Sequence, residues 1–141
     1  MLQLCSIEET LRLGARLASV LRAGDVLGLS AGLGVGKTQL VRGIVAGLAA
    51  PTSTVRACSP SYTMVNTYEL GDLRVHHVDL YRTATPDDLE SIGYWELFAD
   101  PQALVLVEWF RQVPSVLPLR FVELVLTLED ATEPADEASA S

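Results

Sequence analysis

Lys37 is the only lysine in the chain, and it lies in the segment Ala31-Gly32-Leu33-Gly34-Val35-Gly36-Lys37-Thr38. The nine other basic residues are all arginine. A lysine ammonium is a compact charge on a flexible stem, whereas the guanidinium of arginine is a wide planar fork. Glycines at alternate positions let successive backbone N–H groups turn inward around an anion. The segment is therefore typical of a loop that wraps the phosphates of a nucleotide.

The positions around Lys37 suit the same chemistry. A helix that follows the loop would turn its positive dipole end toward the anion. Lys37 would then reach the β- and γ-phosphates, and Thr38 would offer its hydroxyl to Mg²⁺. The first glycine of the strict pattern G-x-x-x-x-G-K-[ST] is replaced by Ala31, which the end of a strand tolerates because φ is negative there.

The elements expected on either side of the loop have the order that it needs. Residues 26–31 form a short apolar run suited to a buried strand, and residues 39–48 have the pattern of a mostly apolar helix. A glycine-rich turn into a helix can also arise from packing alone. The strand–loop–helix order and the single lysine favour phosphate binding over that alternative.

A second candidate follows the clearest buried strand, which is expected over residues 103–107. Glu108 comes directly after these five apolar residues. Ligands of open α/β sheets gather at the carboxyl ends of the strands, so Glu108 is a candidate for binding the metal of a nucleotide. The alternative is a carboxylate that caps a turn or meets solvent. For the neighbouring Trp109, core packing is at least as well favoured as contact with a nucleotide or partner.

Two further segments carry polar side chains near expected strand ends. Asp79 lies in the block His77-Val78-Asp79-Leu80-Tyr81-Arg82 and would hold a water molecule or the metal. Ser59, Ser61 and Thr63 supply three hydroxyls just before a strand. These hydroxyls would sense a γ-phosphate as a switch segment does.

The rest of the chain alternates between helical and extended patterns. A capping box at Ser6 begins a helix that is expected to extend to about Arg22. Pro86, followed by two acids, begins another helix, which Gly93 ends. A turn at Gly71-Asp72 predicts a hairpin. The strands are expected over residues 2–4, 26–31, 62–70, 73–80, 103–107 and 121–128.

Length and composition indicate one domain with an acidic tail. Of the 141 residues, 1–128 are assigned to the P-loop domain and 129–141 to the tail. The tail holds five acids and no base, within a net charge of −8, and such a composition is typical of disorder. The absence of a basic stripe argues against the chain gripping RNA or DNA alone.

The cysteines and histidines do not form a metal-binding pattern. Cys5 and Cys58 lie far apart, and His76 and His77 have no zinc-ligand spacing with them. We expect buried thiols in a reducing compartment, and structural hydrogen bonds from the histidines. No signal peptide and no membrane span is recognisable, which predicts a cytoplasmic location.

Taken together, these motifs resemble those of one family, TsaE. Its members are small bacterial ATPases needed for the N6-threonylcarbamoyladenosine (t6A) modification of tRNA adenosine 37. The resemblance extends from about Ser6 to Pro118 and includes four blocks in order, LGVGKT, SPSYT, HVDLYR and VEW. The acidic stretch from Asp87 to Gly93 is also similar to one in the family. Four ordered blocks are far more specific than a phosphate loop alone.

The resemblance implies a fold, cofactors and partners. The fold would be a three-layer, P-loop NTPase-like α/β fold with parallel central strands and antiparallel flanking strands. The cofactors would be ATP or ADP with Mg²⁺. The partners would be the TsaB and TsaD proteins, of which TsaD transfers the threonylcarbamoyl group. ATP hydrolysis would reset that pair between turnovers, and tRNA would be involved only indirectly.

The resemblance also assigns the site residues by position. Thr38 and Glu108 would hold Mg²⁺, and Asp79 would orient the attacking water or support the metal. Asp79 and Glu108 are thus the catalytic candidates. The nucleotide-binding candidates are Ile7 (near the adenine), Gly34, Val35, Gly36, Lys37, Thr38 and Gln39. The switch-like candidates are Ser59, Ser61 and Thr63.

Three positions depart from the family pattern: Ala31-Gly32 replaces Gly-Asp, Ser61 replaces threonine, and Phe110 replaces a common proline. Other classes fit less well. A small-molecule kinase would need an acceptor pocket and a lid, and a GTPase would need an Asn-Lys-x-Asp segment that this chain lacks. The alternative that stays open is a nucleotide-gated binding module in which hydrolysis is incidental. For the isolated protein we expect slow turnover.

Overall fold

The computed structural model describes residues 3–31, 36–49, 57, 64–82, 85–113 and 117–127. Several predicted features lie outside these residues. They are Gly34 and Val35 of the phosphate loop, the thiol of Cys58, the switch-like Ser59, Ser61 and Thr63, and the tail 129–141.

Five strands form one sheet in the order β2-β3-β4-β1-β5. Four of them, β3, β4, β1 and β5, run parallel, and β2 is antiparallel to β3 at one edge. The predicted hairpin at Gly71-Asp72 joins β2 to β3, and Gly71 has φ +68°, which glycine adopts at little cost. The strands are β1 (Val26–Ala31), β2 (Val65–Leu70), β3 (Leu73–Asp79), β4 (Ala103–Glu108) and β5 (Val122–Leu126).

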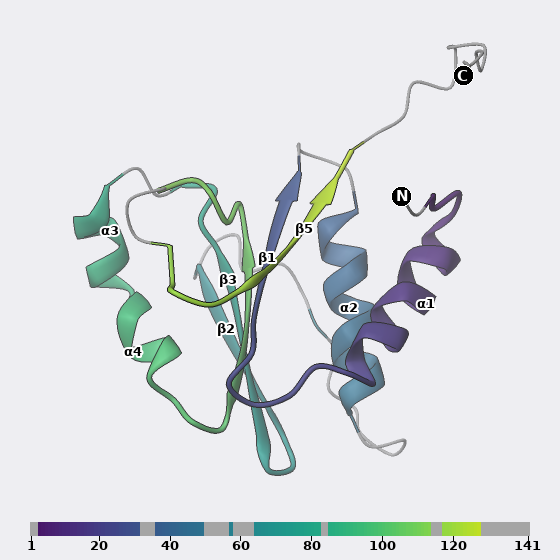
Figure 1. The fold of residues 1–141 in the computed structure, drawn as a ribbon, viewed down its shortest axis with the longest axis horizontal. Helices are drawn as coiled ribbons and strands as arrows, with labels where there is room; N and C mark the ends of the chain where they lie inside the picture. Colours follow the sequence, from purple (N-terminus) through teal and green to yellow (C-terminus); the bar gives the residue numbers. More distant parts are fainter. Residues whose placement is uncertain are drawn as a thin grey trace.

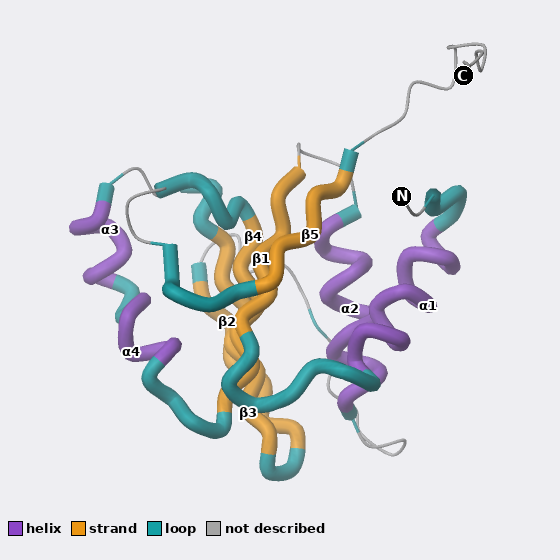
Figure 2. Tube along the Cα trace, in the orientation of Figure 1, coloured by secondary structure: helices purple, strands orange, loops and turns teal. Residues whose placement is uncertain are grey.

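Helices cover both faces of the sheet, which gives three layers (Figures 1 and 2). One pair, α1 and α2, lies on one face, and the shorter pair, α3 and α4, lies on the other. Their bounds are α1 (Ile7–Ala18), α2 (Lys37–Leu48), α3 (Pro86–Ser91) and α4 (Tyr94–Phe98). The predicted fold class is confirmed, with β2 as the antiparallel flanking strand of the part that is described. None of the described helices is long and apolar enough to span a membrane.

Strand β4 lies at the centre of the hydrophobic core, and all six of its residues are buried. Successive side chains of a strand point to opposite faces. Leu104 and Leu106 join the cluster that packs against α2, whereas Val105 and Val107 join the cluster beneath α3 and α4. A strand buried on both faces has a continuous apolar sequence, which is why it was recognisable.

The two long helices pack unusually closely because glycines lie between them. A Cβ on Gly14 of α1 would lie 2.7 Å from the carbonyl oxygen of Leu40, and one on Gly43 of α2 would lie 2.5 Å from that of Leu11. Both glycines therefore let backbone approach backbone. The sequence patterns did not predict this contact.

Several element boundaries differ from the prediction. Helix α1 ends at Ala18 rather than near Arg22, and the hydroxyl of Ser19, its C-cap residue, donates to the carbonyl of Arg16 at 2.6 Å. Gln3 and Leu4 are not in a strand. Cys5, expected to be buried, is exposed, and its N–H donates to the carboxylate of Glu9, while the hydroxyl of the N-cap residue Ser6 accepts from the N–H of Glu9.

Gly93 ends one helix as predicted, but it also begins another. Its φ of +72° makes it the N-cap residue of α4, which the sequence patterns did not separate from the loop that follows. Tyr94, the first residue of α4, is 1% exposed and packs its ring against Phe98 at 4.7 Å. A short helix anchored by one aromatic has too few turns for periodicity to reveal it.

Candidate nucleotide-binding and catalytic site

The last residues of the predicted phosphate loop, Gly36 to Thr38, form the start of helix α2 at the carboxyl end of the sheet. Helix α2 starts at the end of the sheet toward which β1 points (Figure 1). Gly36 caps it with φ +96°, a left-handed conformation that favours glycine. Lys37, the first residue of α2, is only 6% exposed. Its Nζ lies 4.7 Å from the centroid of the Trp109 ring, within the range of a cation–π contact.

Two carboxylates lie side by side at this same end. Asp79 is the last residue of β3 and Glu108 the last residue of β4, and the two are direct partners in the parallel ladder. Glu108 is also paired with Leu29 of β1, the strand that leads into the loop. The topology therefore brings both predicted acids to the carboxyl ends of neighbouring strands next to β1, as expected for parallel strands that end at one edge of a sheet.

The side chains of this pair point to the face that α2 covers. On β3, His77 and Asp79 share one face with Val75, because their spacing is even. Val75 packs in the core cluster of α2, together with Leu106 of β4. Two residues beyond Leu106, Glu108 lies on the same face. His77, Asp79, Glu108 and Lys37 thus converge on one side of the sheet.

Charges in this group act on one another. The pKa of Asp79 is raised from its ordinary value, first by burial and further by the negative charge of Glu108. A hydrogen bond from the Tyr81 N–H at 3.0 Å lowers it, as do the charges of His77 and Lys37. The net result is a raised pKa, so the folded chain disfavours the ionised form of this carboxyl relative to its ordinary value.

Glu108 has a specific hydrogen-bond partner. Its side chain is buried, and its Oε2 lies 2.5 Å from Nε2 of His77, which is fully buried. The second ring nitrogen, Nδ1 of His77, is also buried and has no hydrogen-bond partner among the described residues. The expectation of structural hydrogen bonds from the histidines is confirmed. His76 lies 2.9 Å from Oγ1 of Thr67 and 3.3 Å from Asp100.

The donor set fits Mg²⁺ bound together with a nucleotide. Among the described residues there is no group of three or more His, Cys, Asp or Glu side chains that could hold a metal ion. Mg²⁺ on a nucleotide needs only one or two protein oxygens, because the phosphates and water complete its octahedron. Thr38 at the start of α2 and Glu108 can supply such oxygens, and the mutual repulsion of Asp79 and Glu108 would be relieved by a cation.

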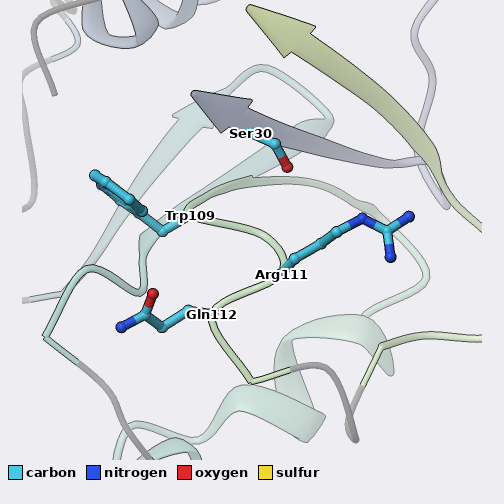
Figure 3. A pocket seen from close by; sticks show the side chains of 4 residues that line it. All are labelled: Ser30, Trp109, Arg111 and Gln112. Atoms are coloured by element: carbon cyan, nitrogen blue, oxygen red, sulfur yellow. The ribbon is translucent and has the colours of Figure 1, made fainter. Parts of the chain in front are cut away.

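The turn after β4 shapes the edge of the site. Trp109 has φ +58°, which is uncommon for a residue with a Cβ, and its ring contacts that of Tyr81 at 4.9 Å. Trp109 also lines a pocket of about 310 Å³ with Ser30, Arg111 and Gln112 (Figure 3). In that view the side chain of Arg111 extends away from Trp109.

The direction of Arg111 follows from an ion pair. Its guanidinium donates to both carboxylate oxygens of Glu123 on β5, at 2.7–2.9 Å. Ser30 donates to the same carboxylate at 2.5 Å. The pKa of Glu123 is therefore lowered, chiefly by the hydrogen bond from Arg111.

Phe110 anchors this turn in the core. It is 1% exposed and packs against Phe121 with 4.8 Å between ring centroids. Its ring covers Gly28 so closely that a Cβ there would lie 2.3 Å from the ring. Phe110, which replaces the common proline of the TsaE pattern, is thus accommodated because residue 28 of the neighbouring strand β1 is a glycine.

Comparison with known proteins gives a family. The family model described as "Threonylcarbamoyl adenosine biosynthesis protein TsaE" matches residues 4–137. The chain belongs to the TsaE family. Among TsaE proteins, that of Nostoc sp. is 36% identical over 126 residues, which cover 87% of this chain and 75% of the Nostoc protein. That of Bacillus subtilis is 35% identical over 119 residues, covering 84% and 72%.

A solved structure supports the same assignment. The crystal structure of YdiB from Bacillus subtilis superposes with a TM-score of 0.68 at 28% identity, covering 90% of this chain and 76% of YdiB. The TsaE fold predicted from the motifs is therefore the fold that is observed.

Within this TsaE fold, the remaining predicted site residues have distinct positions. Thr38 and Gln39 are half-buried in the first turn of α2. Ile7 is 60% exposed at the start of α1, which lies toward the same end of the sheet as the start of α2 (Figure 1). The contacts of His77 with Glu108 and of Lys37 with Trp109 were not predicted. For the contact of His77, the sequence offered one signal. His77 and Asp79 are two residues apart, so in a strand their side chains point to the same face.

Proposed function

We propose that this chain is a Mg²⁺-dependent ATPase of t6A formation in tRNA, which binds and hydrolyses ATP to reset a TsaB–TsaD transferase. Family membership supports the pathway, since the related proteins are named for threonylcarbamoyladenosine biosynthesis. The observation that supports the chemistry best is the convergence of Lys37, Asp79 and Glu108 on one face at the carboxyl end of the sheet.

In this proposal the chain provides positioning and charge. The amides from Gly34 to Thr38 would cradle the phosphates, and Lys37 would leave the Trp109 ring to reach the β- and γ-phosphates. Phosphoryl transfer needs little covalent chemistry from a protein, so positioning of this kind accounts for most of the catalysis.

The two carboxylates have different tasks. Glu108, together with Thr38, would hold Mg²⁺, which would supply charge neutralisation during phosphoryl transfer. Asp79 accepts a hydrogen bond from the attacking water or supports the metal. The charge of Lys37 already lowers the pKa of Asp79, which supports their sharing of one site.

The proposal includes slow turnover in the absence of partners. Transition-state charge in such ATPases is usually stabilised by an arginine. Two arginines near the sheet are engaged elsewhere: Arg111 pairs with Glu123, and Nε of Arg42 donates to the carbonyl of Ala57 at 3.2 Å. A partner that supplies an arginine, or releases Arg111, would complete the site.

The test is Mg²⁺-dependent ATP hydrolysis by the purified chain, alone and with the TsaB–TsaD pair. We expect stimulation by the pair, and loss of turnover with retained ATP binding in Glu108→Ala. If Glu108→Ala supported t6A formation at the full rate in a reconstituted assay, hydrolysis would be incidental. The chain would then be a nucleotide-gated binding module.

A further inference from the structure

We propose that His77 is a positioning residue for Glu108. Its Nε2–H holds one carboxylate oxygen, Oε2, so that Glu108 is fixed in one rotamer and offers its other oxygen, Oε1, to the Mg²⁺–nucleotide complex. The inference rests on the proposed function, in which Glu108 is a metal ligand. It assigns a role in the site to a residue that would otherwise be a buried structural histidine.

The geometry of two adjacent strands carries the inference. His77 pairs with Leu106 in the parallel ladder between β3 and β4, and Glu108 lies two residues further along β4. The imidazole therefore reaches diagonally across the ladder, toward the carboxyl end of the sheet. Nε2 and Oε2 are 2.5 Å apart, which is short for a hydrogen bond to a carboxylate. His77 is 0% exposed and Glu108 is 3% exposed, so water does not compete for this contact.

The hydrogen-bonding capacity of the two groups fixes the direction of donation. An ionised carboxylate has only acceptors, so the proton between the two groups belongs to Nε2. Nδ1 is buried and has no hydrogen-bond partner among the described residues, so among those residues the ring is oriented by its contact with Glu108. His77 is thus a donor directed at Glu108.

The neighbouring histidine provides a contrast in the same strand. His76 is also buried, but it faces the opposite side and contacts Thr67 of β2 and Asp100 before β4. Asp100 also accepts a hydrogen bond from Arg74, so His76 shares that carboxylate with a second side chain. The carboxylate of Glu108, in contrast, is held by the imidazole of His77.

The experiment compares three substitutions at His77 with one at His76. His77→Gln keeps an N–H donor at about the reach of Nε2. His77→Asn keeps the polarity but is too short, and His77→Leu removes the donor while filling the space. His76→Leu is the matched control. For each we would measure kcat and KM for ATP at varied Mg²⁺ concentration, the affinity for ADP with and without Mg²⁺, and the melting temperature.

We expect His77→Leu and His77→Asn to lower kcat about 10- to 100-fold, because outer partners of metal ligands have effects of this size. The Mg²⁺ concentration for half-maximal turnover should rise, and the affinity for ADP should fall only when Mg²⁺ is present. His77→Gln should restore most of the turnover. His76→Leu should lower the melting temperature without changing the Mg²⁺ dependence.

A spectroscopic measurement tests the pair in the folded wild-type protein. Nitrogen-15 NMR of the imidazole side chains should show that Nε2 of His77 carries a proton and that this proton is strongly deshielded. Glu108→Gln should shift that signal and leave the His76 signals unchanged. A His77 ring whose signals ignore Glu108→Gln would overturn the inference, even if every substitution at His77 unfolded the chain.

The outcomes separate the positioning role from the proposed function. If the wild type neither binds nucleotide nor hydrolyses ATP, the proposed function is wrong and the positioning role with it. If the wild type is active and His77→Leu has the same kcat and Mg²⁺ dependence, only the positioning role is wrong. The same holds if all three His77 variants lose stability and turnover in equal proportion, because that is the signature of a structural residue.

Discussion

Charged side chains lie at both ends of the parallel strands, but the two ends differ in how these charges are paired. At the amino end, Arg74 pairs with Glu69 at 2.9 Å and with Asp100 at 2.6 Å. The hydrogen bond from Arg74 lowers the pKa of Asp100, with a further contribution from the N–H of Gln102. Both acids in this cluster are paired with the same base, Arg74.

At the carboxyl end, like charges are adjacent, with Glu108 buried and Asp79 half-buried. Asp79 and Glu108 face the same side, and burial and the charge of Glu108 raise the pKa of Asp79. The only lysine of the chain lies over an aromatic ring nearby. The acids of the amino end are thus offset within the chain, whereas at the carboxyl end the proposed phosphate and cation would offset the charges of Lys37 and of the two acids. Perturbed groups of this kind gather at functional sites.

The largest difference between the two ends should be in catalysis. We expect Lys37→Ala to lower ATP turnover by about 100-fold or more, because it removes a positioned charge from the transition state. Arg74→Ala removes a cation from the amino end and should leave turnover unchanged, although its ion pairs are lost. Steady-state hydrolysis with and without the TsaB–TsaD pair checks both. Equal losses in the two variants would contradict a functional difference between the ends.

A second difference should appear in stability. Gly28→Ala would place a Cβ against the ring of Phe110, which is buried and has little room to move. We expect a loss of about 1–3 kcal/mol in the free energy of unfolding, which is typical of overpacking. Because Phe110 follows Trp109, nucleotide affinity should fall as well.

The control for Gly28 lies before β1, at the amino end. Gly24 has φ +92°, and a Cβ added there would have no atom within 4 Å, so Gly24→Ala introduces backbone strain without a clash. It should destabilise the chain and leave nucleotide affinity unchanged. Urea unfolding of both variants, with calorimetric titration of ADP, separates the two effects. A Gly28→Ala protein with unchanged stability would show that Phe110 can relax.

The smallest difference should appear in how stability depends on pH when neither nucleotide nor Mg²⁺ is present. Asp79 at the carboxyl end and Asp100 at the amino end should affect this dependence with opposite signs. The pKa of Asp79 is raised on folding, so its contribution is present at acidic pH and is lost as pH rises through the folded pKa. Asp79→Asn should therefore be stabilising at neutral pH, and its advantage should shrink in acid.

For Asp100 the sign is opposite. Its pKa is lowered on folding, so its contribution is present above the unfolded pKa and is lost as pH falls through the folded pKa. Asp100→Asn should be destabilising at neutral pH and nearly neutral in acid. Thermal melts of both variants and the wild type across acidic to neutral pH give the comparison. Parallel curves for the two variants would mean that the ends do not differ electrostatically.

Sequence reasoning predicted the elements that have strong local patterns. Strand β4 is apolar throughout because it is buried on both faces, and the hairpin at Gly71-Asp72 has its turn residues in place. The end of α1 at Ala18 could not be predicted in the same way, since the apolar pattern continues to Leu21. Helix α4 has only five residues, fewer than two turns, so it carries no periodicity.

The candidate residues of the site could be named from the sequence, but their contacts with one another could not. Lys37, Asp79 and Glu108 were identified because loop composition and strand ends are local features of the sequence. The bond between His77 and Glu108 depends on which strands are neighbours and in what register, which is a property of the tertiary fold. The packing of Phe110 over Gly28 depends on the same pairing of β1 with β4.

The most direct test of the central claim is calorimetric titration with a non-hydrolysable ATP analogue in Mg²⁺. We expect wild type and Arg74→Ala to bind one equivalent with the same affinity. Lys37→Ala should bind at least tenfold more weakly, a loss of about 1.4 kcal/mol or more. No binding by the wild type, or equal binding by Lys37→Ala, would contradict the claim that the carboxyl end of the sheet is a nucleotide-phosphate site.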